Sequence, residues 1–376
     1  MKKFIGFLVF LAAFAMVFGF TVTAAMADVD LYGSVRFRTY WHDTDKDFNG
    51  YQSSKTGYDD EDLEWRIGYL TRWGANFQSG DISGKVELDT RDQDGNEGSS
   101  EIGDVRVRHM YGEWDFGSGK LLIGQTFNPC TVYSSSLGYY SSGIQPYGGL
   151  GLSYFRTSQI RLTFGNLVLA FLSPDTSAGL EDDGFVDVDT TLPRLEARYS
   201  LKLDPVTVDF MGGWQTYDVV DAVDHEETID SYQLGIYARA NFGPAYVKAV
   251  GTYQQNGANY GLWSATVVDQ AAVYEGDSIQ DCEMWGGSIV AGYKINDMFT
   301  VEGSYGFASA ENDDQDLKNE DDAQVFTLLT KITVAPGVII QPEFIYEDRE
   351  DRYDDGIKTE EGDATIFGVF WMINFK

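Results

Sequence analysis

Apolar and polar residues alternate through segments of about ten residues that recur along most of the chain. In the last segment, Thr365 to Lys376, one face carries Phe367, Val369, Trp371, Ile373 and Phe375, and the other carries Ile366, Gly368, Phe370, Met372 and Asn374. Sixteen strands of this kind have more apolar surface than one soluble core covers. Lipid is the remaining partner, and only a closed barrel leaves no backbone group unpaired in hydrocarbon. The pattern therefore predicts an all-β, transmembrane antiparallel barrel.

Short turns and long loops alternate between these segments. Seven short connections carry Gly, Asn, Asp or Pro at the bend, at Ser79–Asp81, Gly117–Gly119, Gly165–Asn166, Asp204–Pro205, Gly243–Pro244, Asn296–Asp297 and Ala335–Gly337. Eight long connections fall near 43–62, 91–104, 128–155, 174–192, 218–230, 257–283, 311–322 and 347–363. These fifteen connections predict sixteen strands, with short periplasmic turns and long extracellular loops. A barrel of that size leaves an aqueous channel.

Residues 1–27 have the pattern of a cleaved signal peptide. Lys2 and Lys3 precede an apolar run over residues 4–20, and small residues around Ala27 stand before Asp28. A membrane anchor is the alternative interpretation of this run. Residues 28–376 contain no linker and no change in composition, so we expect a single barrel domain, exported to the cell outer membrane.

The chain is strongly acidic, and the acidic residues are concentrated in the loops. Residues 28–376 hold 59 acidic and 25 basic side chains, and the long loops other than the third account for 45 and 7 of them. This pattern indicates an acidic rim around a slightly basic wall. The acidic loops are explained by solvated surface or, alternatively, by divalent cations that join the rim to lipopolysaccharide phosphates. Asp43–Asp47 and Asp92–Gly95 match a calcium loop only in part, so we expect no metal site and no cofactor.

Arginine dominates the predicted inner face of the wall. The inward phase contains Arg36, Arg38, Arg66, Arg72, Arg106, Arg108, Arg194 and Arg198, and all of these except Arg194 are our candidate pore-lining residues. The alternative is that the arginines pair with Glu64, Glu87, Asp89 and Glu196 on neighbouring strands and only stiffen the wall. The third long loop, 128–155, contains no Asp, Glu, Lys or Arg. Its candidate constriction residues are Tyr133, Tyr139, Tyr140 and Tyr147.

From residue 28 to its end the chain resembles the general porins of Gram-negative outer membranes. The resemblance rests on the opening strand Asp30–Val35, the aromatic closing strand, and the long loop after Gly124-Gln125-Thr126. It implies a sixteen-stranded homotrimer whose third loop folds into the lumen. In that family a basic cluster on the early strands faces acidic residues on the third loop, and here those acids are missing. Lys376 after the closing aromatic residue is a second departure.

These observations predict passive diffusion of small hydrophilic solutes and ions, with a mild preference for anions at an Arg-lined constriction. The acidic rim opposes that preference, but the screening length is about 8 Å at physiological ionic strength. We expect the loop tips to lie farther away than this, so the rim affects arrival more than selectivity. One alternative is a substrate-selective channel for sugars, aromatic solutes or anions, suggested by the tyrosine-rich loop. Another is a non-conducting adhesin or structural barrel, suggested by the long acidic loops.

The sequence contains no catalytic constellation. The three histidines, His42, His109 and His225, have no serine nucleophile placed beside them by the alternation. Cys130 and Cys282 belong to strands on nearly opposite sides of the predicted ring, which favours two free thiols over a disulfide. Phosphate-binding glycine loops, paired zinc motifs and nucleic-acid patches are also absent from the sequence. We therefore expect no enzyme and no nucleic-acid partner, but contacts with outer-membrane lipid, lipopolysaccharide and solutes in transit.

Overall fold

The computed structural model describes residues 28–48, 60–67, 71–90, 105–139, 156–176, 185–221, 226–262, 271–275, 278–312, 320–354 and 356–376. Its strands are β1 (Asp28–Thr44), β2 (Asp60–Ile67), β3 (Thr71–Ser79), β4 (Ile82–Thr90), β5 (Val105–Asp115), β6 (Lys120–Phe127), β7 (Arg156–Phe164), β8 (Leu167–Leu172), β9 (Phe185–Asp189), β10 (Arg194–Leu203), β11 (Val206–Asp221), β12 (Glu226–Phe242), β13 (Ala245–Gln255), β14 (Val273–Glu275), β15 (Ser278–Gln280), β16 (Cys282–Lys294), β17 (Phe299–Asn312), β18 (Glu320–Ala335), β19 (Val338–Arg349), β20 (Arg352–Asp354), β21 (Ile357–Thr359) and β22 (Asp363–Phe375).

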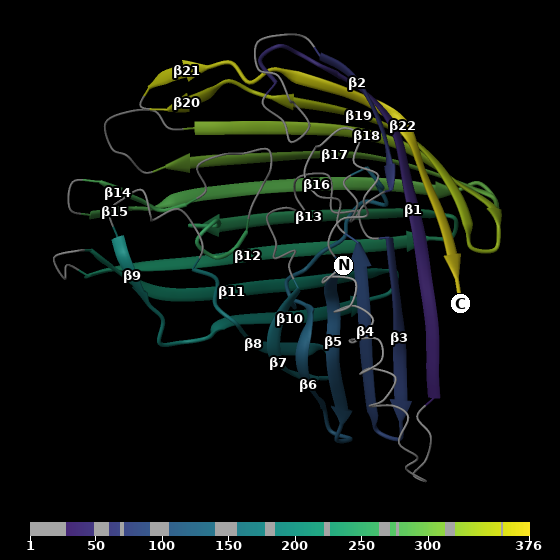
Figure 1. The fold of residues 1–376 in the computed structure, drawn as a ribbon, viewed down its shortest axis with the longest axis horizontal. Helices are drawn as coiled ribbons and strands as arrows, with labels where there is room; N and C mark the ends of the chain where they lie inside the picture. Colours follow the sequence, from purple (N-terminus) through teal and green to yellow (C-terminus); the bar gives the residue numbers. More distant parts are fainter. Residues whose placement is uncertain are drawn as a thin grey trace, which may run out of the picture.

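The strands form one closed antiparallel barrel (Figure 1). Successive strands pair as neighbours around the ring, and the last strand returns to the first, from Gly33↔Phe375 to Thr44↔Ala364. Two barrel strands each consist of two described segments: β2 and β3 both pair with β1, and β9 and β10 both pair with β11. The hairpins β14–β15 and β20–β21 belong to the loops. The ring therefore has the sixteen strands that the sequence predicts.

All seven predicted turns join the strands that the sequence assigned to them. The predicted long connection at 218–230 is wrong, because β11 continues to Asp221 and β12 begins at Glu226, leaving only 222–225 between them. Fifteen register pairs join the two strands, and the last three, from Asp218↔Thr228 to Val220↔Glu226, lie inside the predicted connection. Charge marked this stretch as a loop, but strand pairing beyond the lipid is compatible with charged side chains. Similarly, β9 lies inside the predicted connection 174–192.

The outer face of the barrel carries the apolar half of the alternation. On β12, Leu234 and Ile236 are more than half exposed, while Gln233 before them and Tyr237 after them point inward and are buried. Trp73, Trp114, Trp285 and Trp371 are also exposed on the outside. Exposed apolar side chains in this number are expected where lipid replaces water. No helix among the described residues is long and apolar enough to cross a membrane.

Two irregularities in the sequence pattern have local causes. On β5, the register with β4 shifts so that Glu87 faces His109 and Leu88 faces Val107, which leaves Arg108 as a bulge. Two consecutive side chains, Arg108 and His109, therefore point inward, and the bulge resets the phase so that Glu113 is half-buried beside outward neighbours. On β19, the β18 ladder has no pairs at Gln341 and Pro342, where the proline nitrogen has no hydrogen to donate.

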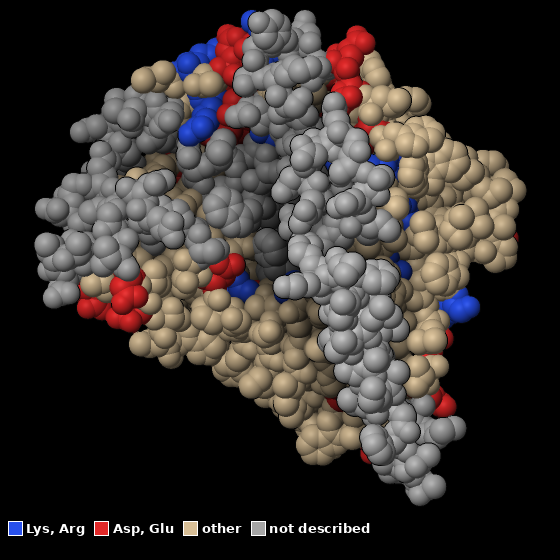
Figure 2. Space-filling model, viewed as in Figure 1, with Lys and Arg blue, Asp and Glu red and all other residues tan. Residues whose placement is uncertain are grey.

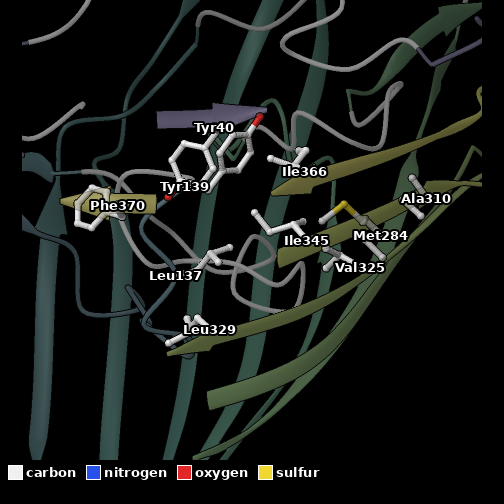
Figure 3. Close-up of a cluster of buried hydrophobic side chains, with 12 residues drawn as sticks. Tyr40, Leu137, Tyr139, Met284, Ala310, Val325, Leu329, Ile345, Ile366 and Phe370 are labelled. Atoms are coloured by element: carbon white, nitrogen blue, oxygen red, sulfur yellow. The ribbon is translucent and has the colours of Figure 1, made fainter. Parts of the chain in front are cut away.

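Part of the inner face is apolar, which the alternation did not predict. Leu137 and Tyr139, in the third loop, pack inside the barrel against Met284, Val325 and Ile345 of the wall (Figure 3). The cluster also contains Tyr40, Ala308, Ala310, Ala323, Leu329, Ile366 and Phe370. Gly138 lies so close to the wall that an added Cβ would be 2.4 Å from the Phe370 ring. The described part of the third loop, residues 128–139, thus folds into the lumen and rests on β16–β19, β22 and β1.

Candidate functional site: the channel interior

Two wall glutamates hold the third loop by its backbone. Glu302 on β17 accepts hydrogen bonds from the Ser136 amide at 2.6 Å, from the hydroxyls of Ser135 and Ser136, and from Tyr246 at 2.5 Å. Glu343 on β19 accepts from the amides of Gly138 at 2.6 Å and Tyr139 at 2.9 Å. The Glu343 carboxylate also accepts from the Tyr40 hydroxyl and the Gln341 amide.

A third glutamate holds the root of the same loop. Glu196 on β10 accepts from the Cys130 amide at 3.0 Å and from Asn128 at 3.4 Å. Cys130 is fully buried, and its thiol points at the carbonyl oxygens of Ala197 and Gly212. As the sequence predicted, Cys130 and Cys282 form no disulfide; both side chains are buried. The uncharged loop is therefore attached to acids of the wall. Of these acids, the sequence indicated only Glu196, as a partner of arginine.

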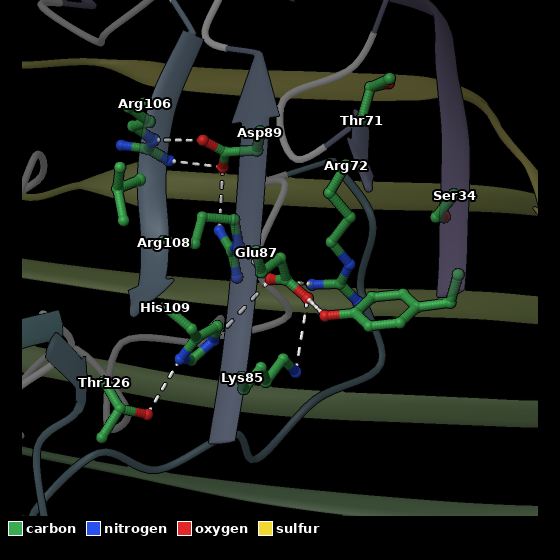
Figure 4. A network of polar contacts seen from close by, with 12 residues as sticks. Ser34, Thr71, Arg72, Lys85, Glu87, Asp89, Arg106, Arg108, His109 and Thr126 are labelled. Carbon is green, nitrogen blue, oxygen red and sulfur yellow. Dashed lines mark hydrogen bonds and ion pairs between the residues drawn. The ribbon is translucent and has the colours of Figure 1, made fainter. Parts of the chain in front are cut away.

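On the opposite side of the lumen, β3, β4 and β5 carry a network of bases around two carboxylates (Figure 4). Arg106 approaches Asp89 with two nitrogens, at 2.7 and 3.1 Å. Arg108 joins both acids, at 2.7 Å from Glu87 and 3.0 Å from Asp89. Glu87 also has Arg72 at 3.8 Å and Lys85 at 3.4 Å. Four bases here share two acids, so the network as a whole is positive.

The same ratio recurs in two further clusters. Arg38 and Arg66 share Glu64, at 3.2 and 2.5 Å. Arg198 and Arg239 share Asp209. Together with the β3–β5 network, eight bases thus meet four carboxylates. In these clusters pairing and a net positive charge therefore coexist, although the sequence treated them as alternatives.

The seven candidate pore-lining arginines all point inward, but they differ in exposure. Arg66, Arg72, Arg106 and Arg198 have side chains between 22% and 38% exposed, and Arg36 is half-buried. Arg38 and Arg108 are buried. Arg38 lies beneath the third loop, where its guanidinium donates to the Tyr139 carbonyl and stacks on the Tyr139 ring, 5.1 Å from its centroid. A lining role for these arginines stays a prediction.

The tyrosines of the third loop occupy different environments. Tyr133 is half-buried, with its ring 5.3 Å from that of Phe127. Tyr139 is buried edge-on against Tyr40, with ring centroids 5.1 Å apart. Tyr140 and Tyr147 lie outside the described residues. Because its ring is covered, Tyr139 braces the loop and offers no stacking surface to a passing solute.

The outer rim is acidic, as the loop sequences predicted. Figure 2 shows patches of Asp and Glu near the end of the barrel that carries β20 and β21. A cavity of about 570 Å³ is lined there by Asp45, Asp47, Glu320, Asp322, Asp348, Arg349, Glu350, Asp351, Tyr353, Glu360, Gly362 and Asp363. Burial and the neighbouring acids Asp322 and Asp348 raise the pKa of Glu350 above its ordinary value of 4.5. Among the described residues, no group of His, Cys, Asp and Glu is arranged to hold a metal ion.

A closed sixteen-stranded barrel with a third loop inside it defines the class of channel-forming outer-membrane proteins. The model of the Gram-negative porin family matches residues 12–346. The chain therefore belongs to the Gram-negative porins, and it is an outer-membrane channel. The family consists of channels rather than enzymes. Among curated proteins, none matches the chain.

Solved structures support the fold. The outer membrane channel DcaP of Acinetobacter baumannii is 21% identical and has a TM-score of 0.69, over 95% of this chain and 99% of that one. An anion-selective porin from Comamonas acidovorans is 14% identical, with a TM-score of 0.60 over 93% of this chain and all of that one. A trimer form of OmpT from Vibrio cholerae is 16% identical, with a TM-score of 0.58, over 93% and 100% of the two chains. At these identities the likeness is one of fold.

Proposed function

We propose that this porin is a passive diffusion channel for small hydrophilic solutes and ions with a mild preference for anions. The observation that carries the proposal is the excess of bases over carboxylates on the inner wall, eight to four in three clusters. Arg106 and Arg72 at this wall are partly exposed, so their fields reach the water of the lumen. Charged rings of this kind set ion selectivity in narrow pores.

The acids that face this wall stand behind the third loop. Glu302 and Glu343 are each 1% exposed, and the loop backbone covers them. Glu302 and Glu343 therefore face the basic wall from behind the loop, and the loop itself has no acidic side chain of its own. Because the loop separates these carboxylates from the passage, the exposed arginines outweigh them for a solute in transit, and the net effect favours anions modestly.

Reversal potentials across a planar bilayer in a KCl gradient test the anion preference. We expect chloride to permeate more easily than potassium, and a cation preference that survives high salt would refute the proposal. The matched comparison is Arg106→Gln against Lys120→Gln, because Lys120 pairs with Glu113 next to a short turn, away from the network. Only the first substitution should move the reversal potential toward zero.

We further infer export by a signal peptide cleaved before Asp28, assembly as a homotrimer, and contact of the rim with lipopolysaccharide. The N-terminal pattern supports the first, and the family resemblance supports the second. N-terminal sequencing of the protein from outer membranes would give Asp28 as the first residue. The mass of the detergent-solubilised protein by light scattering would correspond to three chains, and a monomer in several mild detergents would contradict the trimer.

A further inference from the structure

A second segment, residues 256–262 after β13, folds into the lumen. Asn256, Ala258, Asn259, Tyr260 and Leu262 are all at most 2% exposed. Asn256 starts the segment with a positive φ of 51°, and its side chain accepts from the Cys282 amide and donates to Asp281 and the Asp230 carbonyl. The chain therefore leaves β13 by a fixed bend that directs it inward.

Inward-facing wall residues on two strands, β10 and β11, hold this segment. Arg194 on β10 donates to the Tyr260 carbonyl at 2.5 Å, and its guanidinium lies 4.9 Å from the centre of the Tyr260 ring. On β11, Gln215 donates to the Asn259 carbonyl at 2.8 Å, and Asn259 in turn donates to Tyr217 at 3.0 Å. These contacts leave Arg194, Gln215 and Tyr217 buried, although they occupy the lumen face.

Gly213 on β11 provides the space for the tyrosine. An added Cβ at this position would be 2.0 Å from the Tyr260 hydroxyl oxygen. The neighbouring Gly212 faces the other way, and the nearest atom to its Cβ would be a Leu234 methyl at 3.5 Å. The missing side chain at Gly213 is therefore a notch in the inner wall that Tyr260 fills.

The tyrosine reaches the same carboxylate that holds the third loop. The Tyr260 hydroxyl donates to Glu196 Oε1 at 3.3 Å, and Glu196 Oε2 accepts from the Cys130 amide at 3.0 Å. Gln233 on β12 also donates to Glu196, at 3.4 Å. One buried side chain thus touches both inward segments.

We propose that residues 256–262 form a second constriction element, which narrows the lumen along β10–β13, and that Glu196 clamps it to the root of the third loop. The proposal rests on the channel function proposed above. It explains why inward side chains on the loop-side half of β11–β13, such as Gln215, Gln233 and Gln254, are at most 1% exposed, whereas Arg72 and Arg106 across the lumen remain open to water. The free passage then runs along the basic wall.

The native thiol of Cys130 reports on the clamp, because it is buried beside Glu196. We expect Gly213→Ala, which displaces Tyr260, and Tyr260→Ala to raise the labelling rate of Cys130 at least about tenfold by local opening. The matched control, Gly212→Ala, should leave the rate unchanged. Tyr260→Phe keeps the ring and should give a smaller increase than Tyr260→Ala. Unchanged Cys130 labelling in folded Gly213→Ala and Tyr260→Ala barrels would overturn the clamp.

Single-channel conductance tests the constriction. Tyr260→Ala should conduct more than the unsubstituted protein, and Tyr232→Ala should not, because Tyr232 lies on the outer face and packs 5.9 Å from the Tyr253 ring. Equal conductance of Tyr260→Ala and the unsubstituted channel would overturn the constriction. An unsubstituted barrel with no conductance would instead refute the channel function, and the thiol labelling would still decide the clamp.

Discussion

The attachment of the third loop to Glu343 allows a quantitative prediction. In Glu343→Ala, the buried amides of Gly138 and Tyr139 lose their acceptor. Leaving a buried donor without an acceptor costs about 1 to 3 kcal/mol, so the two hydrogen bonds together stabilise the inward position of the loop by roughly 2 to 6 kcal/mol. Glu302 and the apolar cluster remain, so the loop should open locally while the barrel stays folded.

The assay uses a cysteine introduced at Leu137, which is 1% exposed, in a background with Cys130→Ser and Cys282→Ser. If labelling follows local opening, a loss of about 3 kcal/mol in the free energy that holds the loop inward raises the labelling rate of the introduced cysteine on the order of 100-fold. Asp348→Ala is the control, because Asp348 lies on the same strand and bonds to Gln324 at 3.1 Å on the other face. A rate that stays within about threefold of the parent, in a barrel that remains folded, would refute the reasoning.

Three further predictions follow from other parts of the barrel. Glu350→Gln should slow proteolysis of the β20–β21 hairpin at neutral pH, because the raised pKa of Glu350 means that its charge opposes the folded rim. This gain in resistance to proteolysis should fade as the pH falls through the raised pKa of Glu350 toward 4.5, because the Glu350 carboxylate of the unsubstituted protein is then protonated in the folded state. A gain that does not change with pH would show that the charge of Glu350 is not its cause. Arg106→Gln should weaken anion preference without loss of folding, since Arg108 still neutralises Asp89 at 3.0 Å; an unchanged reversal potential would count against the basic wall. Intact protein should show two unreactive thiols until it is denatured, and a mobility shift on non-reducing electrophoresis would reveal a disulfide instead.

The strands could be predicted because each barrel strand has one face toward lipid and one toward the lumen, and its apolar and polar residues alternate accordingly. The seven turns and the closing strand needed only local chemistry and a period of two residues. The interior of the lumen was harder, because an inward residue meets either water or a folded loop, and its identity alone does not say which. Ile345 and Met284 face inward as apolar residues, since the third loop covers them.

The glutamates that hold the third loop were missed for the same reason. Glu302 and Glu343 lie at inward positions, where the alternation predicts polar residues, and their partners are backbone amides of a distant loop. One signal was present in the sequence: Glu343 is followed on its inward face by the apolar Ile345, which indicates a covered position. The sequence predicts a long connection over 257–283, and its pattern does not indicate that the first residues of this connection fold inward.

The central claim is a water-filled passage along a net positive wall, and single-channel recording in a KCl gradient tests it most directly. The account predicts open channels whose reversal potential has the sign of chloride preference at both low and high salt. A barrel that inserts without conducting, or one that conducts with a lasting preference for potassium, would contradict the account.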